Sequence, residues 1–329
     1  MKHSNVAIFV PHLGCPHDCS FCNQKSIVGQ ATAPTPQDVK AILENALPQS
    51  QQNESEIAFF GGSFTAIDWS YVGSLLEETR QFIGAFKGIR ISTRPDAIDE
   101  KILDALSDYH ITTIELGAQS MDDQVLHLNN RGHTVADVKN ASALIQSKGI
   151  QLGLQMMVGL YGDSPEGALE TARQIAALKP DMVRIYPTLV IEKTKLEELY
   201  RDGIYQPMSL EQALELCKEL LLFFEGQGIP VIRLGLHASE GLEAGLVAGP
   251  WHPAFRELVE SKIYLEKAVK VISQLEVNQM KSTIAVSPNA LSKMIGQHGL
   301  NLKALQDRFG IDFKVVGDKD LDKYEIVVK

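Results

Sequence analysis

The chain has little cysteine, no long apolar run and no excess of positive charge. Four cysteines in 329 residues are too few for a disulfide framework and favour a reducing compartment, which we expect to be the cytoplasm. No apolar run approaches the roughly 20 residues that cross a bilayer, and the opening MKHSN lacks the features of a secretion signal. A net charge of −10 excludes a uniformly basic surface but allows a local basic patch. We therefore expect no membrane partner.

What the chain does contain is an alternation of short β-rich runs and helical patterns. The β-rich runs are VAIFVPHL, EIAFFGG, IRISTRP, TTIELGAQS, QLGLQMMVGL and MVRIYPTLVI. This alternation predicts βα units around a parallel sheet. Six units by about residue 200 fit a partial barrel better than a complete eightfold one. In such folds the chemistry lies at the carboxyl ends of the strands.

Three of the four cysteines follow the first of these runs, in the stretch GCPHDCSFCN. Cys15, Cys19 and Cys22 have the spacing C-x3-C-x2-C. A structural zinc needs a fourth ligand, for which His12 or His17 is available. A cubane iron–sulfur cluster on three thiolates instead leaves one iron open to a small molecule. The spacing alone leaves both sites open.

The cysteine loop, with Phe21 before its last cysteine, resembles the signature of the radical S-adenosylmethionine (SAM) superfamily, whose usual fold is a partial (β/α)6 barrel. Further motifs resemble the radical SAM half of the elongator catalytic subunit family, over about residues 5–275: FFGGSFT, STRPD, ELGAQS, RGHT, YPTLVIEKTKL, VIRLGLHA and AGPWHPAFREL. The resemblance implies that Cys15, Cys19 and Cys22 hold a [4Fe–4S] cluster whose open iron binds SAM. An electron from a donor such as ferredoxin or flavodoxin would then cleave SAM to methionine and a 5′-deoxyadenosyl radical.

The resemblance also implies a set of cofactor contacts. Gly61 and Gly62 would lie against the methionine part of SAM, while Gln119 and Arg131 resemble the pair that contacts its ribose and carboxylate. Each contact has an alternative: an ordinary strand-end turn for the two glycines, and a solvated surface ion pair for Arg131. For Arg94 and Glu115 the alternative is that a charge at a strand end simply braces its neighbours. The expected cofactor-binding residues are Phe21, Gly61, Gly62, Ser63, Arg94, Glu115, Gln119 and Arg131.

Two further residues have alternative roles. Tyr186, at the end of the sixth run, is either a substrate contact or part of the core. Cys217, in the amphipathic run LEQALELCKELLLFF, is expected to be buried in a helix.

The last 49 residues resemble a KH module: strand, helix, G-x-x-G turn, helix and two strands. The turn comprises Gly296, Gln297, His298 and Gly299, and would present backbone N–H groups to a nucleic-acid phosphate. Residues 281–329 carry eight Lys and Arg against six Asp and Glu, a balance of +2, which leaves −12 on the rest. The alternative is a plain helix–turn–helix whose glycines permit a tight turn.

We therefore expect an α/β chain: a TIM-like partial (β/α)6 radical SAM barrel in residues 1–235, a helical connector packing on the barrel in 236–280, and a small α+β KH-like domain in 281–329. The first hypothesis for its function is a radical SAM enzyme that modifies RNA, with tRNA as the first candidate, bound through the C-terminal module. The second is a radical SAM enzyme acting on a small molecule such as a tetrapyrrole. The third is a non-enzymatic RNA-binding protein with a structural zinc.

Overall fold

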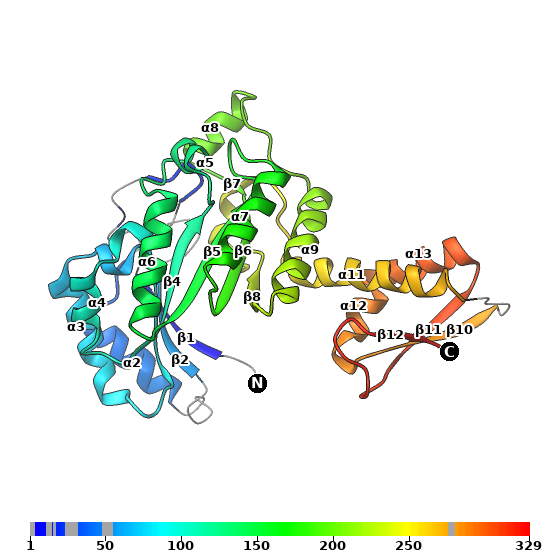
Figure 1. Ribbon diagram of the computed structural model, residues 1–329, viewed down its shortest axis with the longest axis horizontal. Coiled ribbons are helices and arrows are strands. Elements are labelled where there is room, and N and C mark those ends of the chain that lie inside the picture. Colours follow the sequence, from blue (N-terminus) through cyan, green and yellow to red (C-terminus); the bar gives the residue numbers. More distant parts are fainter. Residues whose placement is uncertain (1–3, 11–14, 16–17, 24–31, 48–54, 276–279) are drawn as a thin grey trace. The chain divides into compact units, whose positions relative to one another are not determined.

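The computed structural model describes residues 4–10, 15, 18–23, 32–47, 55–275 and 280–329. These residues divide into two compact units (Figure 1). The first lies within residues 1–213 and 222–251, and the second comprises 214–221 and 252–329. None of the described helices is both long and apolar enough to cross a membrane.

The first unit is built on a sheet of seven parallel strands in the order β1-β2-β3-β4-β5-β6-β8, with β1 and β8 as its edges. The strands are β1 (Ser4–Val10), β2 (Ser55–Gly61), β3 (Gly88–Thr93), β4 (Ile111–Gln119), β5 (Gln151–Val158), β6 (Met182–Pro187) and β8 (Val231–Leu234). The predicted partial (β/α)6 barrel is confirmed, and β8 extends its sheet by one strand beyond the six predicted units. A separate antiparallel pair joins β7 (Val190–Ile191) to β9 (Leu246–Ala248).

Helices alternate with these strands, and α4 and α6 lie along one side of the sheet (Figure 1). Each of the α-helices α2 to α10 follows a Ser, Thr or Asp whose side chain accepts a hydrogen bond from a first-turn backbone N–H. At Thr35 and Thr134 an aspartate three residues on returns the bond, completing a capping box. The helices are α2 (Pro36–Ala46), α3 (Trp69–Thr79), α4 (Glu100–Leu106), α5 (Asp123–Leu128), α6 (Val135–Ser147), α7 (Pro165–Ala177), α8 (Lys195–Arg201), α9 (Leu210–Gly226) and α10 (Glu240–Gly245).

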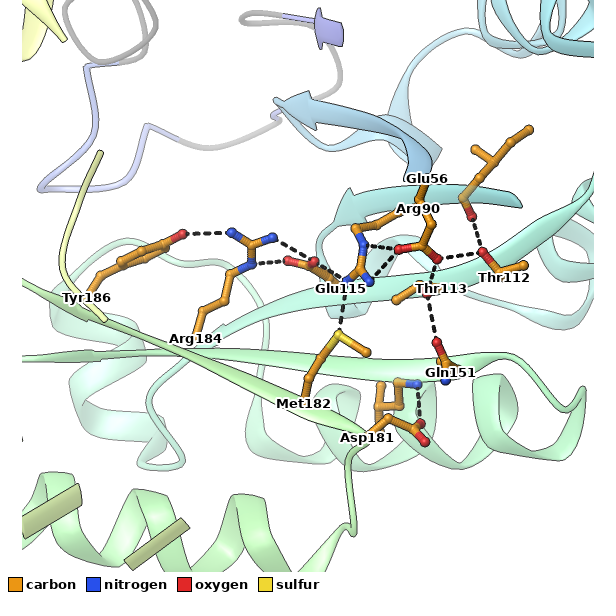
Figure 2. Close-up of polar contacts among 12 residues, drawn as sticks. Glu56, Arg90, Thr112, Thr113, Glu115, Gln151, Asp181, Met182, Arg184 and Tyr186 are labelled. Atoms are coloured by element: carbon orange, nitrogen blue, oxygen red, sulfur yellow. Dashed lines mark hydrogen bonds and ion pairs between the residues drawn. The ribbon is translucent and has the colours of Figure 1, made fainter. Parts of the chain in front are cut away.

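A row of alternating charges crosses one face of this sheet (Figure 2). Arg90 on β3 bonds Glu56 of β2 through Nη2 and Glu115 of β4 through Nη1, each at 2.6 Å. Glu115 also bonds Arg184 of β6, with Nε 2.5 Å from Oε2, and Arg184 Nη1 lies 3.4 Å from the hydroxyl of Tyr186. Glu56 and Arg90 are 0% and 2% exposed. Charges buried this deeply persist because each one faces an opposite charge.

Neighbouring residues complete the surroundings of the two carboxylates. Burial would raise the pKa of Glu56, but Arg90 and the hydroxyls of Thr112 and Thr113 outweigh it, so this pKa lies below its usual range. Gly153 on β5 leaves room for Glu115, since a Cβ there would come within 2.8 Å of the Glu115 Cγ. The row therefore depends on a small residue as well as on charge.

The second unit combines helices with a three-stranded sheet of order β11-β10-β12, in which β10 is parallel to β11 and antiparallel to β12. Its elements are α11 (Phe255–Ile272), β10 (Lys281–Val286), α12 (Leu291–Ile295), α13 (Leu300–Phe309), β11 (Asp312–Gly317) and β12 (Ile326–Val328). The G-x-x-G turn lies between α12 and α13.

Helix α11 is tied to this sheet and its helices by polar contacts. The buried Glu260 pairs with a lysine of α12. Asn301 Nδ2 donates to both the carbonyl and the hydroxyl of Ser261, each at 3.0 Å, and the Tyr324 backbone N–H donates to the Tyr264 hydroxyl at 3.0 Å. The structure thus groups α11 with residues 281–329, whereas 236–251 belong to the first unit.

Removing the cation at the centre of the charged row tests its contribution to stability. Arg90→Met leaves Glu56 and Glu115 buried without the cation that they share, so we expect a loss of about 3–5 kcal/mol in the free energy of unfolding. Urea denaturation measures this loss. The matched control is Arg173→Met, whose ion pair with Glu170 is exposed, and it should change stability by less than about 0.5 kcal/mol. Equal effects of the two substitutions would mean that the buried row adds no more stability than a surface ion pair.

Candidate active site

A cavity of about 280 Å³ opens at the carboxyl ends of the strands of the first unit. Its wall includes every residue that the sequence predicted to hold a cluster or SAM: Cys15, Cys19, Phe21, Cys22, Gly61, Gly62, Ser63, Arg94, Glu115, Gln119 and Arg131. The structure therefore brings these residues together from the cysteine loop, from the ends of β2, β3 and β4, and from the segment between α5 and α6 that carries Arg131. The predicted nucleic-acid residues, Gly296, Gln297, His298 and Gly299, belong to the second unit.

The cysteine loop is fixed to the rest of the first unit through Ser20. The Ser20 backbone N–H donates to the Asn129 carbonyl at 3.1 Å, and its hydroxyl donates to Asn129 Oδ1 at 2.7 Å. Cys15 is exposed, while Cys19 and Cys22 are half-buried, and none of the three is in a disulfide. Burial, followed by the nearby Cys19 and Cys15, raises the pKa of Cys22 to about 12. Thiols gathered in this way ionise together only when a cationic group offsets their charge.

The donor atoms at this end of the cavity fit a cubane cluster. The described wall offers three thiols and no imidazole. Within the described ranges no three His, Cys, Asp or Glu side chains surround one ion position. Each thiolate of a cubane site binds a different iron, so its ligands need not meet at one point. His12 and His17, the candidates for a zinc site, lie outside the described residues.

Two arginines of the cavity wall each have a buried N–H donor without a hydrogen-bond partner among the described residues. Arg131 Nη1 lies 3.0 Å from Cys19 Sγ and Nη2 donates to the Gly117 carbonyl at 2.8 Å, but its buried Nε has no partner among the described residues. Arg94 binds both carboxylate oxygens of Asp96 at 2.9 Å and the carbonyl of Arg131, and its buried Nη1 likewise has no described partner. Buried N–H groups without partners favour an anionic ligand such as a carboxylate.

The glycine turn after β2 has a structural reason that the sequence did not reveal. Gly61 has a φ of +119°, and a Cβ there would lie 2.6 Å from the Val10 carbonyl oxygen of β1. The Gly62 N–H donates to the same oxygen at 2.9 Å. The close approach of β1 thus requires glycine at position 61, whatever binds in the cavity. Ser63 continues the turn, and its Oγ lies 3.7 Å from Cys15 Sγ.

The end of β4 carries a strained residue into the cavity. Gln119 has a φ of +66° in the left-handed region and lies at a bulge between β4 and β5. Its Oε1 accepts a hydrogen bond of 2.9 Å from Gln155 Nε2. A Cβ on Gly117 would come within 2.7 Å of Gln119 Nε2, so the glycine makes room for this side chain. Backbone strain of this kind is typical of functional sites.

Several residues of the cavity and the row below it were missed or left undecided by the sequence. Tyr186 lines the cavity and also packs, with Phe21, against a small buried cluster, so it fits both of the roles expected for it. Glu115 also lines the cavity, but arginines hold it on both sides, so it does brace its neighbours. The signal for Arg90 and Arg184 was one charged residue in each otherwise apolar strand.

Comparisons with known proteins agree with this geometry. The model of the Radical SAM superfamily matches residues 9–175, and that of the Radical_SAM C-terminal domain matches residues 180–265. An uncharacterized protein of Methanocaldococcus jannaschii is 31% identical over 227 residues, which is 67% of each chain. A tRNA uridine(34) acetyltransferase of the same organism is 30% identical over 254 residues, covering 64% of this chain and 47% of that protein.

Among solved structures, the archaeal Elp3 of Methanocaldococcus infernus with an N-terminal deletion matches with a TM-score of 0.62 at 24% identity, over 81% of this chain and 63% of that one. At this identity the likeness concerns the fold. The chain spans about half the length of the curated acetyltransferases that it matches. The superfamily match covers β2 to β5, which contribute residues to the cavity wall. The relatives confirm the resemblance to the elongator catalytic subunit, so the chain belongs to the radical SAM superfamily as an elongator-like enzyme.

Proposed function

We propose that this chain is a radical SAM enzyme that modifies RNA, with tRNA as its substrate class. The observation that carries the proposal is that three thiols line one cavity together with two arginines whose buried donors have no partner among the described residues. Relatives named as tRNA uridine(34) acetyltransferases support the choice of substrate. Because this chain spans about half of their length, their acetyl transfer is not part of the proposal.

Different residues of the chain would hold the cluster and SAM. Cys15, Cys19 and Cys22 would hold a [4Fe–4S] cluster, which with SAM supplies reductive cleavage of SAM to a 5′-deoxyadenosyl radical. Arg131 would bind the SAM carboxylate through its unused Nε. Phe21 packs against the apolar part of the wall and helps to exclude water.

The route for the electron follows from the exposure of the loop. Cys15 is exposed, whereas Cys19 and Cys22 are half-buried. A one-electron donor such as ferredoxin or flavodoxin would therefore approach the cluster at the Cys15 end of the loop, without entering the cavity.

The proposed RNA anchor is the segment 252–329 of the second unit. Gln297 and His298 are exposed, and His298 has a left-handed φ of +53°. Gly296 cannot carry a side chain, because a Cβ there would lie 2.8 Å from the Asn301 backbone N. Asn301 is itself buried and bonded to Ser261 of α11. Asn301 thus packs against the turn from the side of α11, while Gln297 and His298 stay exposed to a phosphate, as the KH-like interpretation requires.

The first test of the proposal is the cluster. Anaerobically prepared protein should contain about four irons and four sulfides per chain. Replacing Cys15, Cys19 and Cys22 together by Ala should remove both, whereas Cys217→Ala, at a thiol buried in α9, should leave the contents unchanged. Analysis of the metal and sulfide contents measures this outcome. One zinc and no sulfide in the native protein would instead support the structural-zinc hypothesis.

The second test concerns SAM. With dithionite the protein should release 5′-deoxyadenosine slowly without substrate, since the cavity forms within the first unit. Arg131→Ala should weaken SAM binding by about 1.5–3 kcal/mol, because a charge-assisted bond is lost. Equilibrium binding measures this effect, with the exposed Arg173→Ala as control. Unchanged SAM affinity in Arg131→Ala would mean that Arg131 contacts Cys19 of the cysteine loop but does not bind SAM.

The third test concerns the tail. Gln297→Asp combined with His298→Asp keeps both glycines but places negative charge where a phosphate would bind, so retention of bulk tRNA should fall. The pair Asn289→Asp and Gln306→Asp adds the same charge at other exposed positions of this unit and serves as control. If both double variants bind tRNA as the wild type does, recognition lies on the first unit. If the wild type does not bind RNA, the small-molecule hypothesis takes its place.

A further inference from the structure

The charged row of the sheet continues to a cation that has no carboxylate partner among the described residues. Arg233 of β8 pairs in register with Arg184 of β6. Arg184 is neutralised by Glu115, with Nε 2.5 Å from Oε2. Arg233 instead donates from Nε to the Gly235 carbonyl at 3.0 Å and from Nη2 to His237 Nδ1 at 3.2 Å. Both acceptors lie on the segment that follows Arg233, so they orient its guanidinium without offsetting its charge.

Counting the charges across the sheet shows the imbalance. Glu56, Arg90, Glu115 and Arg184 alternate in sign and pair with one another, which leaves Arg233 as an additional positive charge. It lies beside Arg184, a like charge on the adjacent strand, and such neighbours repel. Arg233 is half-buried, so water screens this repulsion incompletely. An anion bound to Arg233 would form a favourable ion pair with it and would offset its repulsion from Arg184.

The position of Arg233 makes it accessible to a ligand of the active site. Strand β8 is an edge strand, paired only with β6 in this sheet. Tyr186 and Leu236, which follow Arg184 and Arg233 by two and three residues, both line the cavity. Two residues of a strand span about 7 Å. Arg233 does not itself line the cavity, but its place three residues before Leu236 brings it within reach of a ligand that extends from the cavity over this edge of the sheet.

We propose that Arg233 binds a phosphate of the RNA substrate at the open edge of the sheet, next to the nucleotide that enters the cavity. The inference rests on the proposed function, that the chain acts on RNA. A guanidinium suits this ligand because its planar fork gives two parallel hydrogen bonds to phosphate oxygens. Arg184 cannot take this role, since Glu115 already occupies its fork. The contact positions the substrate and takes no part in bond breaking.

The test is the salt dependence of tRNA binding to the full-length protein. Loss of one phosphate contact in Arg233→Gln should weaken binding and make the slope of log Kobs against log salt shallower by about 0.7–0.9. Arg233→Lys keeps the cation and should keep the slope. Arg173→Gln makes the same charge change on the exposed face of α7 and is the matched control.

Each outcome separates this inference from the proposed function. If the wild type binds tRNA and Arg233→Gln keeps its slope, the phosphate contact is absent and the inference is wrong. Equal changes in Arg233→Gln and Arg173→Gln also overturn it, because they report net charge alone. If the wild type binds no RNA, it is the proposed function that fails.

Thermal unfolding without RNA provides a second readout. Arg233→Gln removes a repulsion with Arg184, so Tm should stay the same or rise in low salt. Inorganic phosphate, compared with chloride at equal ionic strength, should raise Tm more for the wild type than for Arg233→Gln. A lowered Tm together with an unchanged salt slope would give Arg233 a structural role through Gly235 and His237, and would overturn the proposal.

Discussion

The first unit depends on burying charge inside a parallel sheet without leaving any of the central charges unpaired. Arg90 lies between two carboxylates and Glu115 between two guanidinium groups, so each gains attraction on both sides. Desolvation of four charges is offset only if the strands keep their register, because a slip of one residue would turn every side chain to the other face. The row therefore specifies the alignment of β2, β3, β4 and β6 as well as contributing to stability.

This alignment carries over to the active site. The strand ends that bear Gly61, Arg94, Gln119 and Tyr186 lie directly beyond the charged row, so their spacing follows from its register. Glu115 and Tyr186 belong to both the row and the cavity wall. The charged row and the cavity thus form one continuous polar layer. The contact of Arg131 with Cys19 joins the cysteine loop to this layer.

Much of this arrangement could be predicted from the sequence, for a physical reason. Parallel strands end at one edge of a sheet, so the cysteine loop, the glycine turn and Arg94, which each follow a strand, must meet there. Arg131 follows a helix, so its place in the site was expected only from the family resemblance. Contacts between strands distant in sequence could not be predicted. The need for Gly61 comes from Val10, and Arg90 inside an apolar strand is equally compatible with a half-exposed strand until its register is known. Strand β8 is too short to stand out from the segment around it.

The unequal exposure of the three thiols has a consequence for the metal-free chain. Cys15 is exposed, while burial and its neighbours keep Cys22 protonated well above neutral pH. Because the thiolate is the form that oxidants and alkylating reagents attack, Cys22 is protected when no metal is bound. Oxidation in air should therefore start at the exposed Cys15 and reach Cys22 last.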